Sequence, residues 1–288
     1  MESSRRKFLK LAGIAAVGAT AAPALTSLAS DKSDHQARPT AGKTMRHPEA
    51  LTAKHWGMVI DTRQLTSDDD LKPIIEACHR VHNVPVFEED LQIPKLPVEA
   101  LDKAVPKRVV SDKKRHEIKW IWEDEFGHVF PDSENRYLAE RLENMPFLVL
   151  CNHCENPPCV QACPTKATFQ REDGIVLMDF HRCIGCRFCM AACPYGSRSF
   201  NFRDPRQGLT EVNIAFPTRM KGVVEKCNFC AERLAKGLMP ACVEASNGAI
   251  IFGDLTDPDS NVRQALRENY TIRRSPSLGT GPSVYYII

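Results

Sequence analysis

The spacing of the cysteines constrains this chain more than any other feature of its sequence. The 288 residues include 12 cysteines, and all of them except Cys78 lie between Cys151 and Cys242. Two runs of four cysteines, each followed by proline, have the spacings C-x2-C-x4-C-x3-C-P and C-x2-C-x2-C-x3-C-P. Such regular spacing is typical of a metal-binding site rather than of cysteines scattered through a core.

The second spacing is that of bacterial ferredoxins, in which three cysteines bind one iron–sulfur cluster and the fourth binds the neighbouring cluster. We therefore expect two [4Fe–4S] clusters that exchange their fourth ligands. Their predicted ligands are Cys151, Cys154, Cys159 and Cys193 for the first cluster, and Cys183, Cys186, Cys189 and Cys163 for the second. Zinc is the alternative for an isolated C-x2-C pair, and disulfides are the alternative in an exported protein.

A short internal repeat accounts for the other cysteines. The aligned segments are residues 75–78 (IEAC), 160–163 (VQAC), 190–193 (MAAC) and 243–246 (VEAS). Cys78 therefore stands at a fourth-ligand position without a cysteine loop, whereas Cys227, Cys230 and Cys242 form a loop whose fourth position is Ser246. Since fourth ligands cross between paired motifs, Cys78 is predicted to complete a third [4Fe–4S] cluster. The alternative is an ordinary buried Cys78 beside a three-cysteine, [3Fe–4S] centre.

The N-terminal segment predicts export. A basic stretch, residues 1–10, precedes an apolar run, residues 11–22, and small-residue cleavage patterns follow. This run is shorter than the roughly 20 residues of a spanning helix, and no later stretch qualifies, so no direct membrane span is expected. The segment SRRKFLK, residues 4–10, resembles a twin-arginine signal, which implies export of the folded protein to the periplasm. The alternative is a basic arm followed by an alanine-rich helix.

Composition and missing motifs argue against two classes of function. Lys plus Arg number 38 and Asp plus Glu number 36, so the formal net charge of +2 lacks the basic excess of nucleic-acid-binding proteins. The sequence contains no nucleophile elbow, dinucleotide glycine fingerprint or phosphate loop. We therefore expect no nucleic-acid partner and no catalytic residue. The chain is interpreted as a one-electron relay, with a metal-stabilised scaffold that transfers no electrons as the alternative.

From about Trp56 to the C-terminus, the chain resembles the four-motif, ferredoxin-like iron–sulfur subunits of dimethyl sulfoxide, polysulfide and nitrite reductase systems. Residues 56–61 (WGMVID) look like the opening strand of that family, and residues 279–286 (GTGPSVYY) look like its closing segment. Gln64 stands where the family begins its first cysteine loop. Within the family, the signal, the incomplete first motif and residues 181–196 are most similar to the periplasmic subunits of Dsr membrane complexes.

The resemblance implies partners. It predicts a peripheral subunit of a respiratory complex of sulfur or sulfite metabolism, which passes single electrons between a polytopic quinone-interacting membrane subunit and other redox subunits. A multihaem cytochrome c is the expected partner among these. The alternative is that the chain is the iron–sulfur subunit of a molybdopterin oxidoreductase.

The expected fold is α+β, with two ferredoxin-like [4Fe–4S] modules, one inserted in the other, and loop-rich insertions. Residues 1–30 are predicted to be the signal and residues 31–50 a linker. The module ranges are 51–145 for the first half of a one-cluster module with an insertion, 146–202 for a two-cluster module, and 203–261 for the second half. Residues 262–288 are predicted to dock on the membrane subunit, or alternatively to pack on their own domain.

Local patterns predict individual elements. Helices are expected to begin at the fourth-ligand cysteines Cys78, Cys163 and Cys193. The turn at residues 172–174 (EDG) predicts a hairpin, residues 248–252 (GAIIF) predict a strand, and the apolar alternation in residues 116–130 predicts a second hairpin. His153 lies inside the first cysteine loop, either as a plain loop residue or as a hydrogen-bond partner of the cluster.

Overall fold

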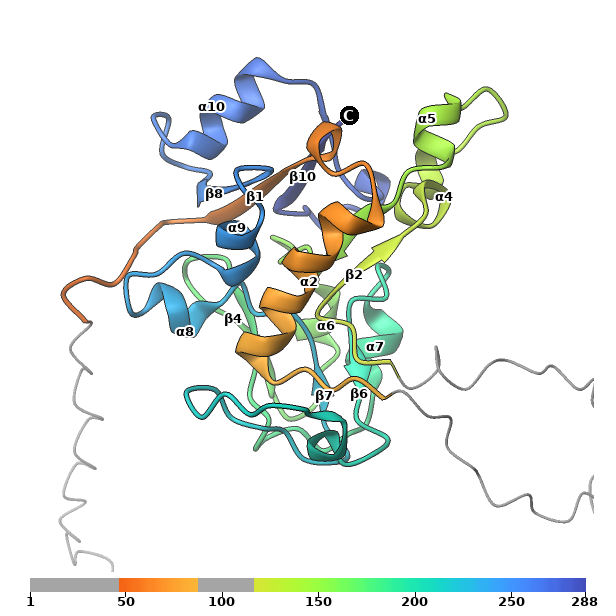
Figure 1. Cartoon of the computed structure of the whole chain (residues 1–288). Helices are drawn as coiled ribbons and strands as arrows, with labels where there is room; N and C mark the ends of the chain where they lie inside the picture. Colours follow the sequence, from red (N-terminus) through yellow and green to blue (C-terminus); the bar gives the residue numbers. More distant parts are fainter. Residues whose placement is uncertain (1–46, 88–116) are drawn as a thin grey trace, which may run out of the picture. The chain divides into compact units, whose positions relative to one another are not determined.

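The computed structural model describes residues 47–87 and 117–288. The predicted signal and most of the predicted linker fall on residues 1–46, which lie outside the described residues, as do residues 88–116. In the described ranges, no helix combines the length and the apolar character that a membrane crossing requires. The described residues belong to one structural unit, residues 47–288 (Figure 1).

A four-stranded sheet joins segments that are far apart in the chain. Its strand order is β8–β1–β10–β9, and the strands are β1 (Trp56–Asp61), β8 (Ile250–Asp254), β9 (Thr271–Ile272) and β10 (Val284–Ile287). β8 runs antiparallel to β1 and β10 runs parallel to it, so that Met58 lies opposite both Phe252 and Val284. All of β1 is buried, as expected of a strand covered on both faces. The strand predicted at residues 248–252 is confirmed, but β8 begins and ends two residues later.

Helices cover both faces of this sheet. α2 (Asp68–His82) and α9 (Ala241–Ala245) lie side by side (Figure 1) and share a core with Met58 and Ile60. α10 (Asn261–Glu268) packs on the opposite face, against Val59. This division follows from the alternation of side chains along a strand. The sheet thereby brings α2, which precedes both cysteine runs, next to α9, which belongs to the last cysteine motif.

The ends of α2 are fixed by local interactions. The backbone N–H of Ser67 donates to the Asp70 carboxylate at 3.0 Å, as in a capping box, and three aspartates place negative charge in the first turn, where the helix dipole favours it. The helix ends before Asn83, which adopts the left-handed conformation (φ 51°). Its buried face consists of Leu71, Ile74, Cys78 and His82.

Short elements accompany the two cysteine runs. They are β3 (Phe147–Leu150), α6 (Pro158–Gln161), β4 (Thr168–Gln170), β5 (Val176–Met178), α7 (Phe188–Ala192) and β6 (Ser199–Phe200). The predicted hairpin is confirmed, since β4 and β5 pair antiparallel with Thr168 opposite Met178. α6 packs against α7, so the two runs face each other.

The remaining elements connect these units. They are η1 (Thr62–Gln64), β2 (Ile121–Asp124), α4 (Phe126–Val129), η3 (Pro131–Ser133), α5 (Glu140–Glu143), η4 (Pro205–Gly208), β7 (Val224–Glu225), α8 (Ala231–Leu234) and η5 (Pro276–Leu278). β6 pairs with β7, which links the end of the second cysteine run to the last cysteine motif.

The prediction that helices begin at the fourth-ligand cysteines is wrong. α6 and α7 end just before Cys163 and Cys193, and α2 runs through Cys78. The physical reason lies in Pro164 and Pro194, because a proline pushes the residue before it out of the helical region. Cys193 accordingly has an extended backbone (φ −82°, ψ 111°).

The second predicted hairpin is also wrong. β2 pairs antiparallel with β3, with Ile121 opposite Leu150, and residues 126–129 form the short helix α4 instead of a returning strand. The apolar segment FLVL of β3 offers a fully buried partner, and the rings of Phe126 and Phe130 pack edge-on against Phe147. Burial of these rings therefore overrides the local alternation.

The C-terminal tail packs on its own domain. β10 lies between β1 and β9, and Tyr286 is completely buried. The hydroxyl of Tyr286 donates to the carbonyl oxygen of Leu148 at 3.2 Å, and the ring of Phe130 meets it edge-on with centroids 5.1 Å apart. The tail is thus a central part of the sheet.

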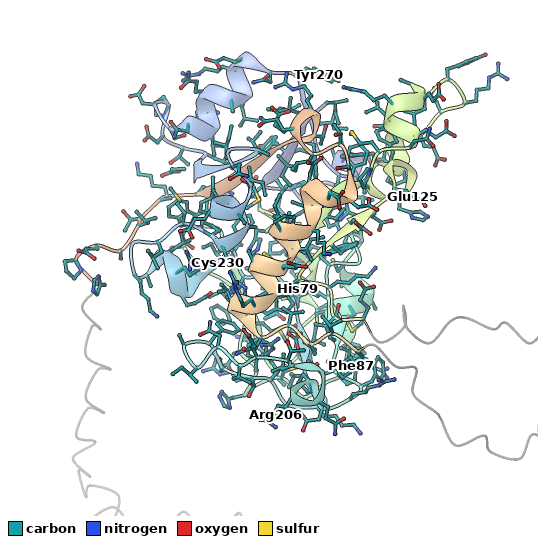
Figure 2. All side chains as sticks on the ribbon, viewed as in Figure 1. His79, Phe87, Glu125, Arg206, Cys230 and Tyr270 are labelled. Carbon is teal, nitrogen blue, oxygen red and sulfur yellow. The ribbon has the colours of Figure 1, made fainter. Side chains whose placement is uncertain are left out.

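Replacing Tyr286 by alanine should lower the free energy of unfolding by about 3–5 kcal/mol, because it empties a buried site and removes a hydrogen bond. Urea unfolding of the purified holoprotein measures this change. The matched control is Tyr270→Ala, since Tyr270 (labelled in Figure 2) is 81% exposed and should change stability by no more than about 0.5 kcal/mol. Equal unfolding midpoints for the two variants would contradict the central role of β10.

Candidate metal centres

All of the predicted ligand cysteines lie in the described part of the chain, and none forms a disulfide. The buried cysteines are Cys78, Cys151, Cys154, Cys159, Cys189, Cys227, Cys230 and Cys242, and the half-buried ones are Cys163, Cys183, Cys186 and Cys193. The disulfide alternative is therefore wrong for this structure. Buried, unbridged thiols in ordered loops are instead suited to holding metal.

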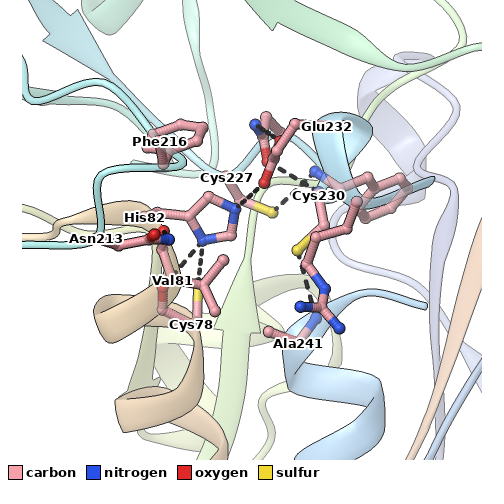
Figure 3. Close-up of polar contacts among 12 residues, drawn as sticks. Cys78, Val81, His82, Asn213, Phe216, Cys227, Cys230, Glu232 and Ala241 are labelled. Carbon is pink, nitrogen blue, oxygen red and sulfur yellow. Dashed lines mark hydrogen bonds and ion pairs between the residues drawn. The ribbon is translucent and has the colours of Figure 1, made fainter. Parts of the chain in front are cut away.

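Thiols from distant segments meet at the third predicted site. Burial raises the pKa of the Cys78 thiol well above its usual value, and the neighbouring thiols of Cys230, Cys227 and Cys242 raise it further. They come from three segments: Cys78 from the last turns of α2, Cys242 from α9, and the other two from the loop between β7 and α8. Figure 3 shows Cys78 on α2 facing Cys227 and Cys230.

Cys230 has a left-handed backbone (φ 51°), a conformation that non-glycine residues adopt only where their surroundings hold it. The backbone N–H of Ala241 donates to its sulfur at 3.4 Å, and the N–H of Phe229 donates to the Cys227 sulfur at 3.5 Å. Amide donors of this kind stabilise negative charge on sulfur, which is the charge state that binds iron.

The first predicted site combines both cysteine runs. Burial raises the pKa of Cys154 to about 12, and the adjacent thiols of Cys151, Cys159 and Cys193 contribute to the rise. Burial and Cys151 likewise raise the pKa of Cys193. A cysteine from the second run therefore lies beside the first run.

The second predicted site shows the reciprocal exchange. Burial raises the pKa of Cys189, and among the thiols that add to this rise are Cys159, Cys183 and Cys163. The N–H of Thr168 donates to the Cys163 sulfur at 3.5 Å. Cys186 lies on the same loop and is half-buried.

The first site adjoins both others. Cys159 is close enough to raise the pKa of Cys189, after burial and against the opposing effect of Arg198. Burial raises the pKa of Cys227, and Cys151 contributes most among the neighbouring thiols. Cys159 and Cys189 also belong to one apolar cluster, and Cys151 and Cys227 to another, so the first site has both of the others as neighbours.

Buried polar atoms without partners lie beside the first site. Burial, reinforced by Lys226 and Arg198, holds the pKa of His153 well below its usual value, so its imidazole is neutral. Its Nδ1 accepts from the N–H of Val176 at 3.1 Å, which places the proton on Nε2. Within the described ranges, Nε2 has no partner, and neither has Nη2 of Arg198 or the side-chain amide of Asn152. Thiols with unpartnered donors beside them fit an anionic group rich in acceptors, as a [4Fe–4S] cluster is.

The sequence reasoning missed His82, which packs against the third site. His82 Nε2 lies 2.8 Å from Glu232 Oε1, and Nδ1 lies 2.9 Å from the carbonyl oxygen of Cys78 and 3.6 Å from its sulfur (Figure 3). Its ring stacks on Trp120 with centroids 4.6 Å apart. The i, i+4 spacing of Cys78 and His82 on one helix was the available signal.

A buried ion pair supports this arrangement. The guanidinium of Arg219 lies 2.6 Å from the Glu225 carboxylate, and both side chains are completely buried. Trp120 Nε1 donates to the same carboxylate at 2.7 Å, and Arg219 also donates to the carbonyl oxygens of His82 and Asn83. The network ties the end of α2 to β7 and thus fixes Cys78 against the last cysteine motif.

Comparisons with known proteins give one consistent result. Residues 144–207 match the model of a 4Fe-4S dicluster domain. The chain is 38% identical to the Hdr-like menaquinol oxidoreductase iron-sulfur subunit 1 of Archaeoglobus fulgidus, over 98% of this chain and 97% of that one. It is 32% identical to the menaquinone reductase iron-sulfur cluster-binding subunit of Nitratidesulfovibrio vulgaris, over 81% of this chain and 88% of that one. The B component of the polysulfide reductase of Wolinella succinogenes is 41% identical over 48% of this chain and 64% of its own length.

Gly185 is required by the loop that carries Cys183, Cys186 and Cys189. Its backbone is left-handed (φ +70°), and a Cβ there would overlap the carbonyl oxygen of Gly222. Gly185→Ala should therefore displace this loop and remove about four iron atoms per chain, the content of one cluster. Iron and sulfide analysis of the purified protein measures the loss.

Gly196 provides the control for this substitution. It is also left-handed (φ +64°), but a Cβ there meets no atom within 4 Å. Gly196→Ala therefore carries only the conformational cost, about 1 kcal/mol, and should keep its iron. Loss of iron from both variants, or from neither, would refute the steric role of Gly185.

Proposed function

The chain belongs to the family of iron–sulfur subunits represented by subunit 1 of the Hdr-like menaquinol oxidoreductase, and we propose that it is an electron-transfer subunit with three [4Fe–4S] clusters. Each such cluster, when bound, accepts and releases one electron. The observation that carries this proposal is the convergence of Cys78 with Cys227, Cys230 and Cys242, next to two further groups of thiols.

In this proposal, the cysteines and the residues around them have three roles. The cysteines hold iron, and the amide N–H groups of Thr168, Phe229 and Ala241 stabilise charge on sulfur. The apolar side chains of the core exclude water from most of the thiols, which lowers the local dielectric and strengthens every charge interaction there. With the first site in the middle, electrons would enter at one end of the series and leave at the other.

We further propose that the one-cluster module encloses the two-cluster module. β1 and α2 precede the dicluster domain, α9 and β8 follow it, and the two halves pair strand to strand and helix to helix. The dicluster domain packs its own helices α6 and α7 in the same way. This shared pattern supports two related modules, one inserted in the other.

The proposed setting is the periplasmic side of a membrane complex. The resemblance of residues 4–10 to a twin-arginine signal supports export of the folded protein. The relatives named for menaquinol oxidation and menaquinone reduction support a quinone-interacting membrane partner. Similarity of residues 181–196 to DsrO supports a Dsr complex of sulfur or sulfite metabolism, with a multihaem cytochrome c as a further partner.

A second candidate is the iron–sulfur subunit of a molybdopterin oxidoreductase, which the similarity to the B component of polysulfide reductase favours. The two candidates differ in the cofactors of their partners. A tagged chain isolated from native membranes should bring down haem c and no molybdenum if the first holds. Stoichiometric molybdenum without haem c would establish the second.

The purified holoprotein should contain about 12 iron atoms and as much sulfide, the content of three cubane clusters. Cys78→Ser should lose one cluster or convert it to a [3Fe–4S] centre, and the other two should be unchanged. Iron and sulfide analysis with EPR measures both results.

Ser246→Ala is the matched control, because Ser246 stands at the corresponding repeat position. Its hydroxyl donates to the carbonyl oxygen of Val243 at 2.8 Å and accepts from the N–H of Ile250 at 3.0 Å, so its role is structural. The variant should retain all of its iron. About 16 iron atoms in the wild type, the content of four cubane clusters, or full iron content in Cys78→Ser, would contradict the assignment of the third site.

A further inference from the structure

Arg198 is a buried cation between the first and second sites. Only 4% of it is exposed, and no described carboxylate forms an ion pair with it. Nη1 donates to the hydroxyl of Thr168 at 3.2 Å and to the sulfur of Met178 at 3.6 Å, and Nη2 has no partner in the described ranges. Burial would lower the pKa of Arg198, but Cys159, Cys189 and Cys151 outweigh it and raise the pKa. These thiols belong to both sites.

Lys226 is a second buried cation and lies beside the third site. It is 2% exposed, and among the described carboxylates none pairs with it. Its Nζ donates to the carbonyl oxygens of Val176 and of Cys227, the latter at 2.7 Å. It also acts on His153 of the first cysteine loop, since after burial it contributes most to the lowered pKa of that imidazole. Lys226 thus lies where the first and third sites adjoin.

A buried charge without a counter-charge strongly destabilises a protein. The chain solves this problem for Arg219 by pairing it with Glu225. Arg198 instead lies near thiols of the first and second sites, and Lys226 lies near the thiol of Cys227. These thiols become thiolates when they bind iron. A cluster with four thiolate ligands carries about two negative charges when oxidised and one more when reduced.

We propose that Arg198 and Lys226 are the internal counter-charges of the iron–sulfur centres, Arg198 between the first and second and Lys226 beside the third, and that both raise the reduction potentials of the centres they adjoin. A fixed cation stabilises the reduced centre more than the oxidised one because the reduced centre is more negative. Burial strengthens the effect, since little water screens it. The inference rests on the proposed electron-transfer function, and it gives Arg198 and Lys226 the role of setting the reduction potentials.

The test is an EPR-monitored redox titration of the full-length holoprotein, with iron counted in each variant. Arg198→Met should lower the reduction equilibrium constants of the first and second centres at least tenfold, about 59 mV for one electron, and change the third less. Lys226→Met should shift the third centre most. Cys78→Ser identifies the signal of the third centre.

Exposed cations provide the matched controls. Arg171 is on the β4–β5 turn and pairs with Asp173 at 2.7 Å, and Lys236 is exposed after α8. Arg171→Met and Lys236→Met should leave all potentials unchanged, because water screens their charges. The shift in Arg198→Met should also be the same at pH 6 and pH 9, since a guanidinium does not titrate there.

Arg198→Lys and Lys226→Arg retain the charges and should retain the iron and most of the wild-type potentials. If the methionine variants lose iron, these two variants show whether the positive charge is what the iron–sulfur centres require. Unchanged potentials in the methionine variants, shifts no larger than those of the controls, or iron loss in the charge-retaining variants would overturn the inference and leave the proposed function standing. A wild-type protein without reducible centres would refute the proposed function instead.

Discussion

Each predicted cluster needs four thiolates at one point in space, and in the predicted assignment every set of four combines cysteines of two separate motifs. The last cysteine motif offers Cys227, Cys230 and Cys242, and its fourth repeat position is Ser246. Cys78 precedes the dicluster domain in the sequence. It lies near this motif because β1 pairs with β8 and α2 packs against α9. The four-stranded sheet therefore brings together the segments that carry the four cysteines of the proposed third site. The buried network of Arg219, Glu225 and Trp120 then holds the end of α2 against β7.

Burial of so many thiols creates an electrostatic problem as well as a geometric one. Without metal, burial raises the pKa of Cys154 and Cys242 to about 12, so the protein alone favours the protonated thiols. Iron binding requires thiolates, whose charge must be compensated in a low dielectric. Amide N–H groups, the Nε2 proton of His153 and the cations Arg198 and Lys226 offer this compensation. The unpartnered donors of the interior thus fit an anionic cofactor.

Local patterns were reliable where a single short-range interaction decides the structure. The EDG turn gives the β4–β5 hairpin because Gly174 accepts a positive φ (+82°). Local reasoning failed where two effects compete. Pro164 and Pro194 are each compatible with the first turn of a helix, but in the structure each follows the end of one. The alternation around Trp120 and Trp122 is real, but β2 finds its partner in the distant β3, whose four apolar residues are all buried.

The sequence by itself determined the class of the protein, because the spacing of ligand cysteines and the short repeat reflect the geometry of cluster binding and can be read along the chain. It yielded the iron–sulfur interpretation, which the matched dicluster domain supports, and it predicted the pairing of the motifs. Only the tertiary structure decided how the sites adjoin, that the C-terminal strand lies inside the sheet, and that Arg198, Lys226 and His82 lie near the thiols. An arginine, a lysine and a histidine carry no spacing signature. Their roles depend on burial and on which charges lie nearby, and these are properties of the folded chain alone.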